Sequence, residues 1–400
     1  MKYRELLNLY KNGQLDEDTK KQVEEDIERQ DAISDYLFDS EKETDFSAEL
    51  TEPDGENKET LQLIRNAIQR AFIKMGLGVG CAILLIICLW VFVMPGLVSK
   101  FYYDPTEIVG FDPENENLTT TRGELDISVY SELFLPAAPR QSFNAEPQGW
   151  GKYRINIPQT TSFTGNFTSV GGFLNRGEMT LYNSDILKPP AGNAFIVPEG
   201  ADFTGGLIDA NTGEQMGPAG TKDEAYGWLE NLKEDEWYTA YVSLSEIMDF
   251  DSFYSWYTEN GEPVSAGTWC AVYTDGEFDE MLANNIGFSI RSVIQSKNWD
   301  KEKYPKLCAM NSDEIFETYN AQTAALHFTS MLKYLRDNPE ITKLMPDSKN
   351  LSESLYDSMI ESVEKDGIRI YGFAIQTQKD TIIELSKDQK VNYIYTKPVL

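Results

Sequence analysis

The sequence predicts an α+β protein in three parts: a small helical N-terminal region, one transmembrane helix, and a large mixed α+β domain with mainly antiparallel sheet. Three observations predict this arrangement. Residues 75–98 form a run of 24 positions without a charge, and about 20 residues suffice to cross a hydrocarbon core roughly 30 Å thick. Apolar residues before this run recur at helical spacing. After it, strand-like runs alternate with helix-like ones.

Composition narrows the classes of partner. The chain has 400 residues, 41% of them hydrophobic, and a formal net charge of −30. Nucleic-acid affinity depends mainly on Lys and Arg side chains that neutralise phosphates. We therefore expect that so acidic a chain does not bind nucleic acid directly. A protein or small-molecule partner fits the acidic composition better.

Changes in pattern along the chain divide it into six expected segments. They are a helical domain at 1–38, an acidic flexible linker at 39–58, a juxtamembrane helix at 59–74, the transmembrane helix at 75–98, an exterior stalk and first sensor region at 99–234, and a final exterior domain at 235–400.

The first segment reads as a short helix, a turn at Asn12-Gly13, and a longer helix that begins in an acidic first turn. Apolar residues lie on one face of each helix, opposite many charges. Two short amphipathic helices bury such faces poorly against each other, so a partner is expected, although a self-contained hairpin is an alternative. The expected partner-binding residues are Leu6, Leu7, Tyr10, Leu15, Val23, Ile27, Ile33 and Leu37.

This opening, LLNLYKNGQLDEDTKKQVEEDIERQ, resembles the start of bacterial anti-sigma factors, in which a helix, a G-x-L turn and a second helix clamp an extracytoplasmic-function sigma factor. Many members of that group hold zinc through a His-x3-Cys-x2-Cys motif on the second helix. Here the corresponding positions are Asp26, Gln30 and Ile33. The resemblance therefore implies a zinc-free domain, and we expect no metal and no cofactor.

Basic residues around the apolar run predict the orientation of the chain. Arg65, Arg70 and Lys74 precede the run, whereas Lys100 is the last basic residue before Arg122 on the other side. Because Lys and Arg near a membrane are retained inside, the N-terminus should be cytoplasmic and the C-terminus extracytoplasmic. We expect a single-pass protein of the cell membrane.

The exterior part should combine strands and helices. Strand candidates are residues 127–134, 153–157, 237–244, 268–274, 286–290, 368–375 and 391–395. Helix candidates are residues 223–232, 244–256, 313–337 and 351–364. Residues 101–125 read as a stalk or an irregular loop.

Four pieces of the exterior part are similar to the C-terminal domain of the sigma-factor-regulator family. They are WYTAYVSLSEIMDFDSFYSWY at 237–257, WCAVYT at 269–274, NIGFSI at 285–290, and SMIESVEKDGIRIYGFAIQTQKDTIIEL at 358–385. The membrane run with its flanks resembles the N-terminal domain of the same family. The resemblance implies a membrane-anchored regulator whose cytoplasmic part restrains a sigma factor and whose exterior part senses an envelope ligand of unknown identity.

No residue pattern predicts catalysis. His327, the only histidine, falls on an apolar helical face and has no nucleophile motif beside it, so we expect a packed residue and not an enzyme. Cys270 and Cys308 either pair as a disulfide in an oxidising compartment or stay as two buried thiols. The aromatic stretch at 237–257 either packs in the core or lines a glycan or peptide groove.

The expected function is that of an anti-sigma factor. It would sequester an extracytoplasmic-function sigma factor at the inner membrane face and release it on an envelope signal, through a membrane protease or through a change transmitted along the helix. The alternative is an envelope glycan- or peptide-binding protein, or an envelope enzyme, with a short cytoplasmic tail.

Overall fold

The structure is a computed structural model of the chain. It describes residues 9–13, 15–42, 55–112, 115–136, 142–160, 167–183, 194–198, 221–259, 268–274, 286–290, 299–308, 320–345 and 352–399. The chain forms two compact units, residues 1–86 and residues 87–400. The mixed α+β class with antiparallel sheets is confirmed.

The first unit contains a long helix, α2 (Glu17–Lys42). It begins where its acidic first turn predicts, because the Asp16 carboxylate accepts a hydrogen bond from the Thr19 N–H at 2.9 Å and so satisfies a free amide of the first turn. Before it, Gly13 adopts φ +67 and its N–H donates to the Tyr10 carbonyl at 3.1 Å. The left-handed conformation at Gly13 ends the preceding helical turn.

The apolar run forms one continuous helical segment: α3 (Gly55–Cys88), the π-helical turn η1 (Leu89–Val93) and α4 (Met94–Ser99). Residues Gln62–Ser99 are long and apolar enough to cross a membrane, and none of that stretch is buried. Pro95 lies in the first turn of α4 and lacks an amide hydrogen. Its ring also crowds the carbonyl four residues earlier, which accounts for the wider turn just before it.

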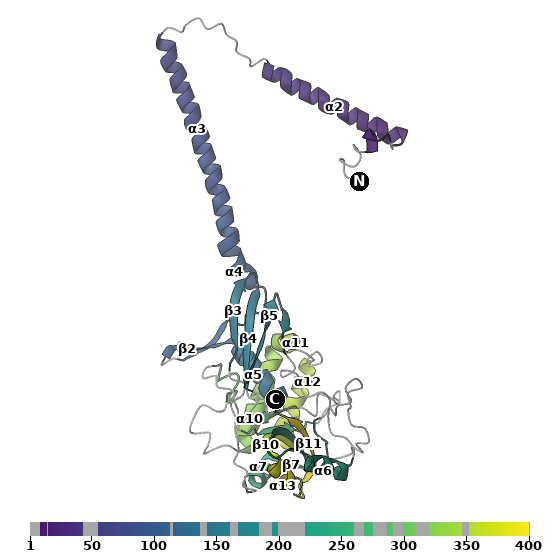
Figure 1. The fold of residues 1–400 in the computed structure, drawn as a ribbon. Coiled ribbons are helices and arrows are strands. Elements are labelled where there is room, and N and C mark those ends of the chain that lie inside the picture. The colour runs from purple at the N-terminus through teal and green to yellow at the C-terminus, as the bar shows by residue number, and fades with distance from the viewer. Residues whose placement is uncertain are drawn as a thin grey trace. The chain divides into compact units, whose positions relative to one another are not determined.

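In the second unit, the main sheet has five antiparallel strands in the order β11-β7-β10-β8-β9. The strands are β7 (Trp237–Asp249), β8 (Trp269–Val272), β9 (Gly287–Ser289), β10 (Arg369–Gln378) and β11 (Val391–Pro398). Each corresponds to a predicted run, because β-branched and aromatic residues are concentrated there. The sheet lies at the end of the unit away from α4 (Figure 1).

A second antiparallel sheet follows chain order, β3-β4-β5-β6. Its strands are β3 (Asn144–Gly149), β4 (Lys152–Thr160), β5 (Phe167–Asn175) and β6 (Glu178–Leu181). Alternate residues of β4, such as Tyr153 and Ile155, are buried, so one face packs inward and the other meets solvent. A two-stranded ribbon of β1 (Ile108–Asp112) and β2 (Asn115–Thr121) precedes it.

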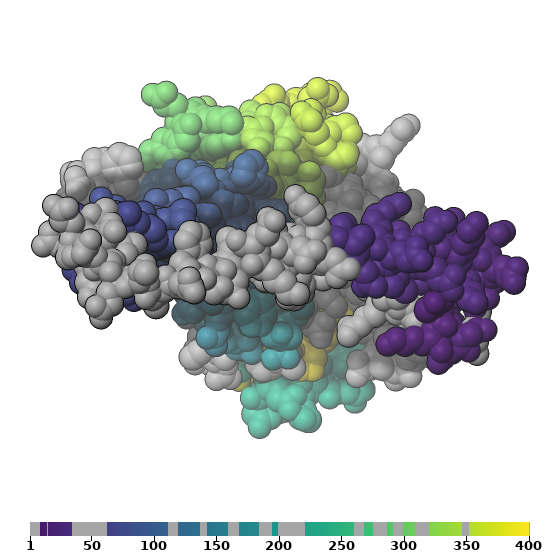
Figure 2. Space-filling view, turned by 90° about the horizontal axis from the view of Figure 1, so that it is seen from above, coloured from purple at the N-terminus to yellow at the C-terminus, as the bar shows by residue number. Residues whose placement is uncertain are grey.

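Seven described helices surround the sheets of the second unit. They are α5 (Arg122–Phe134), α6 (Lys222–Glu230), α7 (Phe250–Glu259), α10 (Ala321–Asp337), α11 (Glu340–Leu344), α12 (Glu353–Asp366) and α13 (Lys379–Leu385). Arg336 of α10 and Asp357 of α12 form an ion pair at 2.7 Å. The two helices adjoin in the space-filling view, α10 in green and α12 in yellow-green (Figure 2).

Two predictions for the beginning of the exterior part are wrong. Residues 127–134, predicted as a strand, belong to helix α5, whose N-terminus is capped by the Thr121 hydroxyl accepting from the Glu124 N–H. Because α5 is buried on all sides, its sequence lacks the apolar stripe that marks a surface helix. Residues 101–125 are not only a stalk, since they include β1 and β2. In addition, β7 continues to Asp249, so the helix predicted from 244 begins at Phe250.

The five-stranded sheet separates two apolar clusters. The larger one includes Val242, Cys270 and Phe373 with α5, α7, α10 and α12. The smaller one gathers aromatic rings on the alternate residues, where Phe195 stacks on Trp269 at 6.0 Å between ring centroids. Both sheet faces are therefore covered, which gives strands that are buried at nearly every position.

Candidate functional site

The predicted partner-binding residues fall on a helical surface of the first unit. Leu6 and Leu7 lie outside the described residues, and the side chain of Leu37 is also outside them. Among the rest, Tyr10, Leu15 and Ile27 are half-buried, Val23 is buried, and Ile33 is 55% exposed.

The apolar residues of α2 form one stripe. Val23 and Ile27 are four residues apart and therefore share a face, and Ile33 lies at the edge of the same stripe, about 120° round the helix from Ile27. The Tyr10 hydroxyl donates to Glu24 at 3.1 Å and fixes the preceding helical turn beside α2. Beyond these contacts the stripe extends to Ile33, whose side chain is exposed to solvent. This surface is chemically able to bind an apolar partner.

Metal chemistry has no support in the part of the chain that the structure describes. No group of His, Cys, Asp and Glu side chains there could hold a metal ion. At the positions corresponding to the zinc motif, Asp26 instead forms a loose ion pair with Arg29 at 3.9 Å. Such exposed pairs contribute little to stability.

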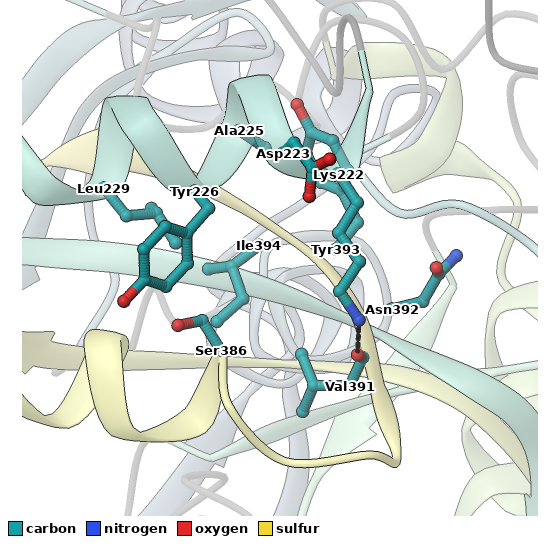
Figure 3. Close-up of a pocket in the computed structure, with 10 residues that line it drawn as sticks. All are labelled: Lys222, Asp223, Ala225, Tyr226, Leu229, Ser386, Val391, Asn392, Tyr393 and Ile394. Carbon is teal, nitrogen blue, oxygen red and sulfur yellow. Dashed lines mark hydrogen bonds between the residues drawn. The ribbon is translucent and has the colours of Figure 1, made fainter.

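The second unit has a small groove between α6 and β11, an edge strand of the main sheet (Figure 3). Its volume is about 90 Å³, well below the roughly 300–1,000 Å³ of sites that enclose drug-sized ligands. The Lys222 ammonium spans it and donates to the Val391 carbonyl at 2.8 Å. A capping box, in which Thr221 and Glu224 exchange hydrogen bonds, fixes the start of α6. The groove is thus a packed junction that leaves little room for a ligand.

His327 is fully buried on α10, between the Phe288 ring and the loop before the helix. Its Nδ1 is 2.8 Å from the Lys306 carbonyl, which identifies the neutral tautomer with a proton on Nδ1. Burial lowers the pKa of His327 to about 4, with the two backbone contacts acting in the opposite direction. The imidazole is therefore a neutral core residue at physiological pH.

Cys270 and Cys308 are both free and both buried, which corresponds to the second of the two alternatives predicted for them. Burial raises the pKa of the Cys270 thiol well above its usual range, and it raises the pKa of Cys308 as well. A protonated thiol is a poor nucleophile. These side chains fill the core of the second unit.

The aromatic stretch predicted at 237–257 also belongs mainly to the core. Phe250, Phe253 and Tyr257 are buried. Trp256 contacts Phe373 edge to face at 6.0 Å and donates from Nε1 to Asp388 at 3.1 Å. Core packing, rather than a groove for a ligand, explains these residues.

Sequence reasoning missed a buried carboxylate that joins three parts of the second unit. Asp126 of α5 accepts from the Tyr103 hydroxyl at 2.7 Å and from the Tyr334 hydroxyl of α10 at 2.6 Å. Burial raises the pKa of Asp126 to about 6, although these hydrogen bonds and nearby Arg122 lower it. The one available signal is a charged residue inside the apolar run LDISVY. Tyr103 comes four residues after the end of α4, so this contact ties the chain just beyond the apolar helix to the core.

A second buried carboxylate closes an edge of the main sheet. Glu132 of α5 is 3% exposed, and its Oε1 accepts from the Ser289 N–H of β9 at 2.6 Å. The Glu132 backbone carbonyl accepts from Trp269 Nε1 at 2.7 Å. Helix α5 therefore covers the β9 edge, which would otherwise present unpaired amides to other chains.

The region that contains the main sheet matches a known protein family. Residues 229–395 match the family described as Sigma factor regulator C-terminal, and the match spans β7 to β11 almost completely. No curated protein matches the chain, and no solved structure does. The C-terminal part of the chain is therefore similar to the Sigma factor regulator C-terminal family, and this similarity supports an anti-sigma-factor regulatory role for the chain.

Proposed function

We propose that the chain is a membrane-anchored anti-sigma factor that holds an extracytoplasmic-function sigma factor at the cytoplasmic face and releases it on an envelope signal. The observation that carries this proposal is the family match of residues 229–395 on a chain that also has one apolar helix long enough to span a membrane. The helix separates the matched region from α2, so a regulatory domain and a partner-binding helix would lie in different compartments.

The apolar stripe of α2 is the surface we assign to the sigma factor. The helix has 26 residues, which at about 1.5 Å per residue gives a length near 39 Å. Ile33 is 55% exposed on it. Fully burying such a side chain in a complex contributes about 1.5–3 kcal/mol, so a handful of these residues supports stable binding.

The proposed orientation follows from the cations beside the helix. Arg65, Arg70 and Lys74 precede the apolar run, and Lys100 follows it. The excess of basic residues on the N-terminal side supports a cytoplasmic position for α2. In this orientation the exterior unit faces the envelope.

We further propose that the chain acts by binding and not by catalysis. His327 is neutral and enclosed, and Cys270 and Cys308 are buried thiols, so none of these groups is suited to meet a substrate. Release of the sigma factor would then follow cleavage by a membrane protease or a change in the exterior unit transmitted through the helix.

The proposal is tested by co-purifying the full chain with each alternative sigma factor of its cell. Ile33→Asp places a charge in the stripe of α2, and Ala32→Asp places the same charge on the preceding residue, which is exposed on the side of the helix opposite the stripe. We expect Ile33→Asp to weaken sigma binding at least 10-fold and Ala32→Asp to leave it within 2-fold. Failure of the unmodified chain to retain any sigma factor would refute the proposal.

A further inference from the structure

Two turns of the second sheet lie at the end of the apolar helix. The β3–β4 turn places Gly149, Trp150 and Gly151 at φ +75, +59 and +69, and the β5–β6 turn places Arg176 and Gly177 at +53 and +84. Left-handed conformations suit Gly or Asn in such turns, yet each turn here holds one bulky residue. The two exceptions are a tryptophan and an arginine, side chains that are typical of membrane–water interfaces.

The β3–β4 turn contacts the helix directly. The Trp150 N–H donates to the Pro95 carbonyl at 3.3 Å, and the Gly151 N–H donates to the Ser99 hydroxyl at 2.9 Å. The rings of Trp150 and Trp90 are 5.1 Å apart between centroids. Strand β3 therefore ends, and strand β4 begins, beside α4 (Figure 1).

The turn also has its backbone polar groups paired within the protein. The Gly151 carbonyl accepts from the Arg176 N–H at 2.8 Å, and the Trp150 carbonyl accepts from Arg176 Nε at 3.3 Å. Together with the bonds to Pro95 and Ser99, both the N–H and the C=O of Trp150 and Gly151 are satisfied. Transfer of a loop from water to the membrane costs little free energy when its backbone N–H and C=O groups are already hydrogen-bonded.

The length of the helix places this turn at the membrane boundary. From Lys74, about 20 residues at about 1.5 Å each cross a core of roughly 30 Å and end near Met94. Trp90 then lies about one helical turn inside the far boundary, and Trp150 lies beside it. Phe92, two residues after Trp90, is 79% exposed, so a further aromatic ring faces outward close to this level.

Charge at this end of the exterior unit contrasts with the rest of the chain. Lys100, Lys152 and Arg176 are exposed around the two turns, and the nearby acids are Glu178 on β6 and Asp104 beside Tyr153. The chain as a whole has a net charge of −30. A local excess of cations beside a membrane helix complements anionic lipid headgroups, which attract each Lys or Arg near the surface.

We propose that these two turns form an interface foot, made of residues 149–152 and 176–177, that inserts Trp150 at the hydrocarbon edge and binds anionic lipid headgroups through Lys152 and Arg176. The inference rests on the proposed membrane insertion of the helix. The foot holds the exterior unit on the bilayer surface, so a ligand of this unit would have to act next to the lipid.

Depth-dependent quenching tests the insertion of Trp150 in the full chain. The chain is placed in nanodiscs with lipids brominated near the top of the acyl chains. Trp90→Phe leaves Trp150 as the reporter at the foot, and we expect tryptophan quenching to persist in this single variant. In the Trp90→Phe/Trp150→Phe double variant, quenching should fall to background. Adding Trp228→Phe instead, a 44% exposed residue on α6, should not remove the quenching. Equal quenching of the single and double variants would overturn the proposal.

The same series separates this inference from the membrane placement of the helix. Trp150→Phe alone retains Trp90, so it must stay quenched if the helix is inserted. Loss of quenching in that variant would reject the membrane placement itself. Because Phe keeps an apolar ring at the turn, an unchanged unfolding temperature of the exterior unit checks that each variant is folded.

A second arm tests the assignment of lipid charge. We expect Trp150 to be quenched more strongly in discs containing phosphatidylglycerol than in phosphatidylcholine discs, with the difference reduced at high salt. Arg176→Gln should reduce the difference and Lys152→Gln/Arg176→Gln should remove it, whereas Lys301→Gln, at an exposed lysine beside Trp299, should retain it. Equal quenching in both kinds of disc would overturn the headgroup assignment.

Discussion

Two buried titratable groups in the exterior unit should make its stability depend on pH in opposite directions. His327 has a pKa of about 4 when folded, against 6.5 for a free imidazole, because burial disfavours its charged form. Asp126 has a pKa of about 6 when folded, against 3.8, because burial outweighs its two tyrosine hydrogen bonds and Arg122, with Glu340 adding to the rise. Removing one group should reveal the effect of the other.

The sign for each group follows from which state binds more protons. Below pH 6.5 the unfolded chain protonates His327 while the folded chain does not, so stability falls as the pH drops toward 4. Below pH 6 the folded chain protonates Asp126 while the unfolded chain does not, so stability rises as the pH drops toward 3.8. Between pH 7 and pH 5, protonation of the unfolded histidine lowers the unfolding free energy by about 2 kcal/mol, and protonation of the folded aspartate raises it by about 1 kcal/mol.

The measurement is urea unfolding of the full chain in detergent, followed by tryptophan fluorescence at pH 7 and pH 5. Relative to the unmodified chain, His327→Gln should gain about 2 kcal/mol of unfolding free energy on going from pH 7 to pH 5, and Asp126→Asn should lose about 1 kcal/mol. Comparing variants removes the contribution of the many other carboxylates. The reasoning is refuted if both variants show the same pH dependence as the unmodified chain.

Three further predictions concern packing and exposure. A methyl group at Gly287 would meet the Cys270 carbonyl, so Gly287→Ala should lower the unfolding temperature strongly, whereas Gly227→Ala, with open space around it inside a helix, should raise stability by about 0.5–1 kcal/mol in thermal unfolding. Thr221→Ala removes the capping box of α6 and should cost about 1 kcal/mol in urea unfolding, and a change near zero would contradict the role of the cap. Thiol labelling of Cys270 and Cys308 should be slow in the folded chain and complete in denaturant, and rapid native labelling would contradict their burial.

The sequence predicts local elements well where neighbouring residues decide them. The strands of the main sheet follow runs such as WYTAYV and YGFAI, because β-branched and aromatic residues fit a pleated, half-buried surface. The same reasoning wrongly predicts a strand at helix α5. Because this helix is buried on every side, it lacks the polar face that produces the helical period of apolar residues. Local composition alone therefore misleads where tertiary packing encloses an element.

The site was predictable only in part for a related reason. The stripe of α2 with Ile33 is a pattern within one helix and can be found from spacing. The contacts of Asp126 with Tyr103 and Tyr334, and of Trp150 with Trp90, join residues far apart in the chain. No spacing rule links such pairs, because the fold brings them together only after distant segments pack.

The π-helical turn at Leu89–Val93 changes the angular phase of the long helix. A wide turn accommodates one residue more than an α-helical turn, so side chains after it are rotated by about 100° from the positions an unbroken α-helix would give them. Faces assigned by counting from α3 therefore do not carry over to α4. If the wide turn shifted by one residue along the chain, the residue that it shifted past would point to a different side of the helix. The length of the helix would stay almost constant.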